Sequence, residues 1–288
     1  FDILHLCNPP DIFFPLALFY RLLGSRVIFD HHDLFPELVA NRYTGLSGKI
    51  LHAVSLVTEF LTFLTAHVVI STNHSYRRVA IQRGKKADDR VIIVRNGPKA
   101  AEFIPVQPDP DLKCGFKFLV CYAGVMGYED GVQELIESIR YVLREMGRRD
   151  ILFTLLGDGT VRSQAQSRVD QWGLAANVQF TGMIYNKELL RKYLCTADVC
   201  VSPEPLTPLN RYSTFIKIAE YMAMGKPVIA YDLEETRYTA QEAALYIEPG
   251  NTRAFGHSIV SLLDNPGLRE QMGTVGRRRI LEQLCWEH

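Results

Sequence analysis

Short apolar runs alternate with longer amphipathic segments along most of the 288-residue chain. The short runs are rich in β-branched and aromatic side chains, as buried strands are, whereas the longer segments repeat apolar residues every three or four positions, as helices do. This alternation is typical of parallel α/β sheets. In the first part of the chain it predicts strands at residues 3–6, 26–29, 68–71 and 91–94 and helices at 13–23 and 49–64.

The alternation breaks after Asn96 and resumes at residue 118. Within the segment between them, residues 103–115 contain three prolines, and each proline keeps the residue before it extended. We therefore expect a partial N-terminal domain at 1–104, a linker at 105–117 and a second α/β domain at 118–288. The second series predicts strands at 118–122, 152–156, 178–180, 199–201 and 228–231 and helices at 132–146, 163–172, 187–195, 215–224, 252–263 and 266–284.

Charge and composition exclude several classes of partner. Lysine plus arginine equals aspartate plus glutamate, at 32 each, so no surplus charge attracts nucleic acid or an anionic membrane. The six cysteines lie far apart and show no metal-ligand spacing, which indicates reduced thiols in a cytoplasmic protein. We expect small-molecule partners, no metal and no cofactor. The chain opens on a strand-like run and stops inside a predicted helix, so we expect a fragment that lacks both termini.

The segment at residues 202–249 carries the most specific pattern. It predicts a polar loop, a helix at 215–224 that ends at Gly225, and a buried strand at 228–231. The start of this helix offers unpaired backbone N–H groups and the positive end of the helix dipole, which favour a phosphate. The segment therefore indicates a site for an anionic ligand with hydroxyl groups, such as a nucleotide.

The sequence STFIKIAEYMAMGKPVIAYDLEETR within this segment resembles the donor site of family 4 glycosyltransferases, and especially a bacterial polysaccharide-type subgroup with PLN, ST and KIxEYMAxGKP. Further resemblance lies in FDILHLCNPPD, VIFDHHDLFPE, VIIVRNGP, FTLLGDG and NVQFTG. The family resemblance implies a GT-B fold: two Rossmann-like α/β domains with parallel sheets that face a cleft, the N-terminal one incomplete here. The C-terminal domain is then expected to hold most of the donor.

The resemblance also implies the reaction. A retaining glycosyltransferase moves a sugar from a nucleotide-diphosphate sugar to a hydroxyl acceptor, here in polysaccharide or glycoconjugate biosynthesis and with lipid-linked acceptors among the candidates. The implied mechanism is a front-face displacement, in which the departing phosphate assists removal of the acceptor proton. Neither a covalent enzyme intermediate nor an obligatory metal is expected.

Glu220 is the foremost candidate in the donor site, because its position resembles the second glutamate of the family's E-x7-E motif, which holds the ribose. Lys217 is expected to reach the diphosphate as a point charge. The hydroxyls of Ser213 and Thr214 and the backbone from Ser213 to Ile216 are expected to cradle phosphate oxygens. Further donor-site candidates are Asn210, Arg211, Phe215, Gly124 and Gly127, and for the base Thr181, Gly182 and Met183. A solvated helix glutamate and a surface lysine remain the alternative readings of Glu220 and Lys217.

The chain departs from the family pattern at three positions. The first glutamate of E-x7-E is replaced by Tyr212, and Glu204 lies eight residues before that place. Val125 and Asp130 stand roughly where many members carry a basic pair. Phosphate binding is therefore better supported than sugar contact.

In the N-terminal half, DHHD at residues 30–33 ends a predicted strand. His32 aligns with the histidine of the family's HDLWP-like segment and is expected to contact the sugar or place the acceptor, with Asp33 orienting it. Neighbouring side chains point apart in an extended chain, so His31, His32 and Asp33 do not predict a metal site. Asn8 and Asp11 are weaker candidates.

The apolar helix predicted at 49–64 bears on whether the protein contacts a membrane. We expect it to pack in a core or between domains, because it lacks the basic face of an interfacial helix. Membrane contact is expected to be peripheral at most, at the inner face of the cell membrane. Two other functions remain open: a non-catalytic nucleotide-sugar-binding protein and a GT-B-fold sugar-nucleotide epimerase.

Overall fold

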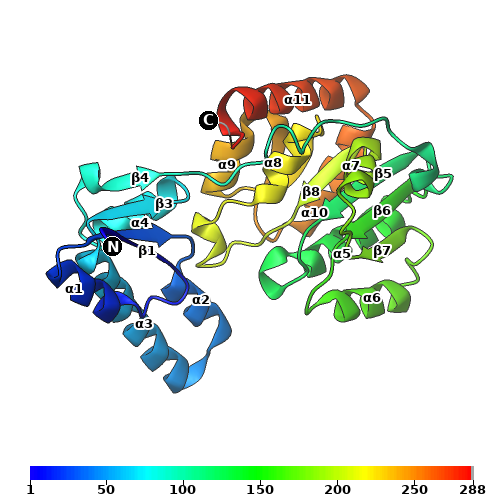
Figure 1. Ribbon diagram of the computed structural model, residues 1–288. Coiled ribbons are helices and arrows are strands. Elements are labelled where there is room, and N and C mark those ends of the chain that lie inside the picture. Colours follow the sequence, from blue (N-terminus) through cyan, green and yellow to red (C-terminus); the bar gives the residue numbers. More distant parts are fainter. Residues whose placement is uncertain (287–288) are drawn as a thin grey trace. The chain divides into compact units, whose positions relative to one another are not determined.

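The computed structural model describes residues 1–286, and its contacts divide the chain into two compact units (Figure 1). Unit 1 contains Phe1–Asn96 and Thr207–Thr214, and unit 2 contains Gly97–Leu206 and the chain from Phe215 onward. This division differs from the sequence-based boundaries in two places: the change of unit comes at Gly97, and a later loop joins unit 1. The segment expected to be a linker packs on the core of unit 2 through Val106, Leu112 and Phe116.

Unit 1 is built on a four-stranded parallel sheet in the order β1-β2-β3-β4. Its core lies on one face of the sheet, where alternate residues such as Val27 and Phe29 are buried. On the opposite face, Ile3, His5 and Cys7 are exposed. The strands are β1 Ile3–Cys7, β2 Arg26–His31, β3 Val68–Ser71 and β4 Val91–Ile93, and the helices are α1 Phe14–Leu22, α2 Phe35–Arg42, α3 Gly45–Thr65 and α4 His74–Gln82.

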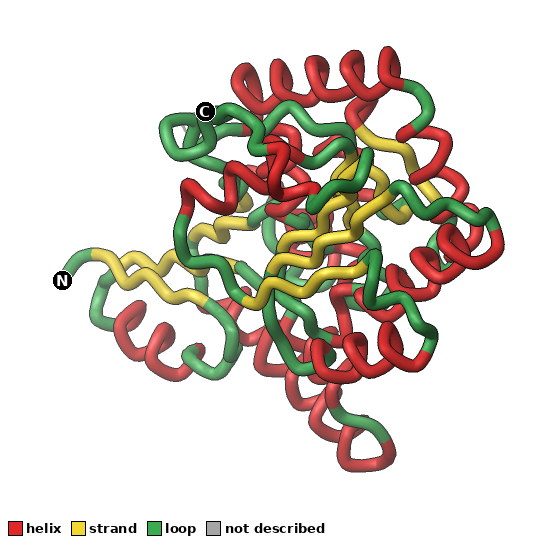
Figure 2. The backbone as a smooth tube through the Cα atoms, turned by 90° about the vertical axis from the view of Figure 1, so that its right-hand side faces the viewer, coloured by secondary structure: helices red, strands yellow, loops and turns green. Residues whose placement is uncertain are grey.

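Unit 2 is built on a six-stranded parallel sheet in the order β10-β9-β8-β5-β6-β7. The strands are β5 Phe118–Ala123, β6 Ile151–Leu156, β7 Val178–Gly182, β8 Val199–Ser202, β9 Val228–Tyr231 and β10 Ala244–Ile247. The helices are α5 Val132–Arg140, α6 Arg162–Gln171, α7 Lys187–Thr196, α8 Ile216–Ala223, α9 Glu234–Ala240, α10 Thr252–Leu263 and α11 Pro266–Arg279. Strands appear in yellow and helices in red in Figure 2.

Both faces of this second sheet are buried, as expected for a sheet covered by helices on two sides. Along β5, alternate residues enter different cores: Val120 and Tyr122 one, Leu119 and Cys121 the other. The chain begins the sheet at β5 and later returns to its other side at β8. Because ligands of open α/β sheets bind at the carboxyl ends of the strands where the order reverses, the β5–β8 boundary is the place to look for a site.

The expected α/β alternation is confirmed, with differences at several ends. The helices predicted at 132–146 and 266–284 are each shorter α-helices followed by one π-helical turn, Tyr141–Glu145 and Ile280–Leu284. The sequence analysis did not predict α2, α4, α9 and β10, which are short or strongly polar. Short 3-10 turns lie at Asp88–Arg90, Pro110–Lys113, Tyr128–Asp130, Asn210–Tyr212 and Gln241–Ala243.

Helix α3 is long and apolar enough to cross a membrane by length and composition alone, and a third of its most apolar window is buried. Many of its apolar residues face outward instead of packing in a core, which differs from the sequence-based expectation. The exposed apolar residues of α3 are Leu46, Ile50, Leu51, Val54, Val57, Phe60 and Leu64. Its buried residues are Gly48, Ser55, Glu59, Thr62, Phe63 and Thr65.

Candidate functional site

Lys217 lies in a buried ion cluster of unit 2, at the carboxyl ends of β5 and β8. Its Nζ is 2.6 Å from Oε1 of Glu204 and 3.4 Å from Oδ1 of Asp130. It also donates a hydrogen bond of 3.1 Å to the Tyr122 hydroxyl. The side chain of Lys217 is 10% exposed and that of Glu204 is 2% exposed, and Ser202 Oγ donates to the second carboxylate oxygen of Glu204.

These contacts set the charge of the cluster. Burial alone lowers the pKa of Lys217, but the charge of Glu204, with Tyr122 and Asp130, raises it above its ordinary value, so the ammonium stays charged. Two carboxyl groups thus face one cation. The sequence analysis assigned Lys217 to a diphosphate, whereas in the structure its ammonium binds carboxylates. Sequence reasoning left Glu204 out of the candidate set because its partner lies on a different element.

The N-terminus of α8 begins beside this cluster. The residue before the helix, Phe215, has an extended backbone, and no side chain caps the first turn. The first backbone N–H groups of the helix therefore lack the side-chain partner that most helix starts have, and the positive end of the helix dipole lies there. Such a terminus favours a phosphate group.

Glu220 lies one helical turn further along α8 and is partly buried. Its carboxylate accepts no hydrogen bond from the part of the chain that the structure describes. Burial raises the pKa of Glu220, and the charge of Lys217 opposes this effect. A partly buried carboxylate with free acceptor capacity is suited to a pair of ligand hydroxyls.

Glycines let three loops of unit 2 pack backbone against backbone at the same sheet edge. The N–H of Gly157 donates to the carbonyl of Gly182 at 2.9 Å, and a Cβ on Gly157 would lie 1.8 Å from the carbonyl oxygen of Gly124. A Cβ on Gly124 would lie 2.9 Å from Nζ of Lys217. The structure therefore brings two of the predicted glycines, Gly124 and Gly182, to the edge that holds the ion cluster.

The other candidate residues of these loops, Gly127, Thr181 and Met183, make only local hydrogen bonds or are exposed. The N–H of Gly127 donates to Oδ2 of Asp130 at 2.9 Å. Thr181 Oγ1 donates to the carbonyl of Gly182 at 2.9 Å, and Met183 is exposed. No direct contact joins Thr181 or Met183 to the ion cluster among residues 1–286.

The residues predicted to form one phosphate cradle are divided between the two units. Asn73 of unit 1 donates to the carbonyl of Tyr212 at 2.9 Å and to Thr214 Oγ1 at 3.1 Å. Ser213 Oγ donates to the carbonyl of Leu209 at 3.0 Å. The hydroxyls of Ser213 and Thr214 therefore make hydrogen bonds inside unit 1, which also contains Asn210 and Arg211, whereas Phe215 starts α8 in unit 2.

His32 and Asp33 follow β2 in unit 1, and Asn8 fixes their backbone. Oδ1 of Asn8 accepts from the N–H of His32 at 2.7 Å, and Nδ2 of Asn8 donates to the carbonyl of Asp33 at 2.6 Å. The His32 ring contacts Asp30, not Asp33 as expected, with Nε2 3.2 Å from Oδ1. The sequence could have indicated the contact between Asp30 and His32, because residues two apart in an extended chain share a face.

A second buried ion cluster joins three helices of unit 1. Arg83 Nη1 is 2.6 Å from Oε1 of Glu37, and Arg83 Nε is 2.6 Å from Oε2 of Glu59. Burial raises the pKa of Glu59 to about 7 and that of nearby Asp11 to about 7, although Arg83 opposes both effects. Burial lowers the pKa of His31 to about 3, so this imidazole is neutral.

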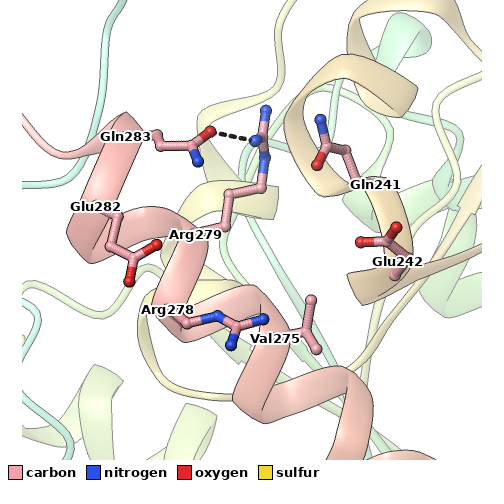
Figure 3. A pocket seen from close by; sticks show the side chains of 7 residues that line it. All are labelled: Gln241, Glu242, Val275, Arg278, Arg279, Glu282 and Gln283. Atoms are coloured by element: carbon pink, nitrogen blue, oxygen red, sulfur yellow. Dashed lines mark hydrogen bonds between the residues drawn. The ribbon is translucent and has the colours of Figure 1, made fainter.

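A surface pocket of about 260 Å³ lies beside the C-terminal end of α11 (Figure 3). Arg279 in this pocket donates to the carbonyls of Thr239 at 3.0 Å and Tyr238 at 2.7 Å, and to Gln283 at 2.6 Å. Those carbonyls belong to the last turn of α9, where helix carbonyls lack intrahelical partners. Arg279 therefore serves as a structural cap, and its pocket is not a candidate binding site.

The chain was compared with protein families and with proteins of known function or structure. Residues 117–265, just over half of the chain, match the family described as "Glycosyl transferases group 1". Alpha-D-kanosaminyltransferase of Streptomyces kanamyceticus is 28% identical over 156 residues, which are 54% of this chain and 38% of that protein. The chain thus spans well under half the length of this relative.

Two solved structures are similar over the whole chain. Sucrose-phosphate synthase of Thermosynechococcus elongatus has a TM-score of 0.78 at 21% identity and is covered to 70%. The Anabaena protein HepE in complex with UDP has a TM-score of 0.81 at 15% identity and is covered to 76%. Together with the two parallel sheets, this similarity confirms the GT-B fold.

Proposed function

Because this chain belongs to the group 1 glycosyl transferases, as its sequence resemblance implied, we propose that it transfers a sugar from a nucleotide-diphosphate sugar to a hydroxyl acceptor. The observation that carries the proposal is the free carboxylate of Glu220, one turn inside the uncapped N-terminus of α8. These two features lie at the carboxyl edge of the sheet in unit 2, where α/β sheets bind nucleotides.

The donor would bind along α8. The diphosphate accepts hydrogen bonds from the first N–H groups of the helix, and Glu220 accepts from the two ribose hydroxyls. The base lies against the backbone from Thr181 to Met183, at the carboxyl end of β7. HepE, whose fold this chain shares, was solved with UDP, which makes UDP the natural first probe.

In the proposed reaction the enzyme acts by positioning and by balancing charge. The bond from the sugar to the diphosphate breaks, the acceptor oxygen bonds to the sugar on the same face, and the acceptor proton passes to the departing phosphate oxygen. The sugar configuration is retained, and the step requires no cofactor. His32 and Asp33 are proposed to place the acceptor.

Lys217 has an indirect role in this proposal. It holds Glu204 and Asp130 beneath the glycine loop that starts at Gly124, and so keeps two carboxylates from repelling the diphosphate. The cluster still holds one more carboxylate than cations, so it limits repulsion of the diphosphate but does not supply the positive charge of the absent basic pair. The role of the chain in polysaccharide or glycoconjugate biosynthesis follows from the same family resemblance.

The exposed apolar side of α3 supports a peripheral membrane location and a lipid-linked acceptor as a finer proposal. Apolar residues of the neighbouring helix α1 are exposed too, among them Phe19, Leu22 and Leu23. Two adjacent apolar helix surfaces are suited to the boundary between headgroups and acyl chains. Sedimentation with anionic lipid vesicles tests this point, and a protein that stays in the supernatant contradicts it.

Calorimetric titration with UDP tests the donor site. Glu220→Gln removes the charge-assisted acceptor and is expected to weaken UDP binding about tenfold or more. Glu270→Gln, an exposed position on α11, is the matched control and should bind UDP as the wild type does. Equal affinity in Glu220→Gln and the wild type would contradict the site.

Incubation with a panel of nucleotide sugars separates the functional classes. Nucleotide release that depends on an acceptor supports transfer. Conversion of the donor without an acceptor indicates an epimerase, and binding without conversion indicates a binding protein. Either of the last two outcomes overturns the proposed reaction while leaving the donor site intact.

A further inference from the structure

Four side chains with metal-ligating atoms gather at the carboxyl ends of β1 and β2 in unit 1. Cys7 and Asp30 are direct partners in the parallel register of these strands, so their side chains stand next to each other on one face. His5 lies two residues before Cys7, and His32 lies two residues after Asp30. The ligand atoms of Cys7, Asp30 and His32 all lie within 4.8 Å of one another.

The measured spacing is close to that of a metal centre. Asp30 stands between two imidazoles, with Oδ1 3.2 Å from Nε2 of His32 and Oδ2 3.2 Å from Nε2 of His5. In a tetrahedral zinc site with nitrogen and oxygen ligands at about 2.0–2.1 Å, neighbouring ligand atoms are about 3.3 Å apart. Small side-chain rotations therefore suffice to place these atoms around one ion.

The backbone around the cluster is already held in place. The N–H of Asn8 donates to the carbonyl of Asp30 at 3.2 Å, while Oδ1 of Asn8 accepts from the N–H of His32 at 2.7 Å. Asn8 is itself buried. These hydrogen bonds hold the backbone that carries Asp30 and His32, which reduces the entropy that binding costs.

The cluster is also accessible. β1 is an edge strand, and Cys7 at its end is exposed. The His32 side chain is 39% exposed and the Asp30 side chain 18%. An ion can therefore reach the ligands from solvent without any rearrangement of the core.

We propose that Cys7, Asp30 and His32 bind a divalent transition-metal ion of the Zn²⁺ type. The thiolate, imidazole and carboxylate donors suit Zn²⁺ or Co²⁺, whereas Mg²⁺ and Ca²⁺ prefer oxygen ligands alone. Three protein ligands leave a fourth position for His5 or water. From the sequence no metal was expected, because the cysteines lie far apart along the chain and the side chains of His31, His32 and Asp33 point apart. The structure buries His31 in the core and assembles a different set. The proposal does not rest on glycosyl transfer, but it gives the His32 ring a ligand role in place of contact with the acceptor.

Titration of the reduced, chelator-treated chain, expressed without a histidine tag, tests the site. We expect one Zn²⁺ per chain by calorimetry, and with Co²⁺ a near-ultraviolet thiolate-to-metal band. Cys7→Ser should abolish the band and weaken Zn²⁺ binding about tenfold or more. Cys114→Ser, which alters the other exposed cysteine of the described residues, is the control and should retain both.

A second variant guards against a folding defect in the first. His32→Gln keeps the thiol, so it should retain native circular dichroism while losing about tenfold or more in Zn²⁺ affinity. The proposal is overturned if the wild type shows no saturable binding of one ion. It is equally overturned if Cys7→Ser and His32→Gln bind Zn²⁺ as the wild type does, or if the Co²⁺ band disappears with Cys114→Ser.

Discussion

In each unit a partly buried cation contacts two carboxylates, yet the two clusters occupy different kinds of place. In unit 1, Arg83 contacts Glu37 on α2 and Glu59 on α3, so its planar guanidinium joins helices. In unit 2, Lys217 contacts Glu204 and Asp130 in the loops at the carboxyl edge of the sheet. The same charge pattern therefore serves packing in one unit and lies beside a candidate ligand site in the other.

Burial of an ion pair therefore does not by itself indicate function. What distinguishes Lys217 is its surroundings: a glycine loop at Gly124, an uncapped helix start and the free carboxylate of Glu220. Arg83 instead lies at the end of α4 among helix side chains. Variants that disturb stability and ligand binding separately can test this distinction.

The largest expected effect is on stability in unit 1. Arg83→Met leaves Glu37 and Glu59 buried without their cation and is expected to lower the free energy of unfolding by about 3 kcal/mol or more at pH 8, which lies above the raised pKa of Glu59 of about 7. Urea unfolding followed by circular dichroism measures this. Arg90→Met removes an exposed pair with Asp89 and should change stability by less than about 0.5 kcal/mol. UDP affinity of the folded Arg83→Met protein should stay unchanged, and a loss would contradict the comparison.

The second largest expected effect is a loss of both stability and UDP binding in unit 2. Lys217→Met leaves Glu204 buried and unpaired, which is expected to cost about 2 kcal/mol of stability and to weaken UDP binding by repulsion of the diphosphate. Adding Glu204→Gln removes the buried charge and should recover much of the stability. Thermal unfolding with and without UDP measures both. If Lys217→Met alone binds UDP with wild-type affinity, this cluster too serves packing alone.

The smallest expected effect is on how the stability of unit 1 depends on pH. The pKa of Asp11 is raised from 3.8 to about 7, so the folded state holds this proton more tightly than the unfolded state does. The stabilising contribution is therefore present below about pH 4 and is lost as pH rises to about 7. Asp11→Asn cannot titrate and should make the protection of α3 less dependent on pH. Hydrogen exchange corrected for intrinsic rates measures this, and an unchanged pH profile in the variant would count against a protonated Asp11.

Local patterns predicted most of the elements. The strands Val68–Ser71 and Val228–Tyr231 and the helix Thr252–Leu263 have the bounds expected from the sequence. The two strands are short apolar runs, and the helix buries apolar residues three or four positions apart. β10 was not predicted although it is an apolar run of the same length as β3 and β9, whereas α4 was missed because its exposed side chains are strongly polar.

The candidate site was predictable in part. The start of α8 and the position of Glu220 follow from one continuous segment, so a sequence read locally can find them. The partners of Lys217 come from the ends of two other elements, and their contact depends on β5 lying beside β8. Likewise, the sequence analysis paired His32 with its neighbour Asp33, whereas the pleat of β2 places Asp30 against the ring.

By itself the sequence determined the α/β alternation, the family and the helix that carries Glu220, because periodicity and motifs are written in adjacent residues. Only the tertiary structure decided that Lys217 is paired with carboxylates, that the loop Thr207–Thr214 joins unit 1, and that Cys7 stands beside Asp30. The physical reason is that these contacts depend on strand order and register. Both are set by how whole elements pack, and no single stretch of the chain encodes them.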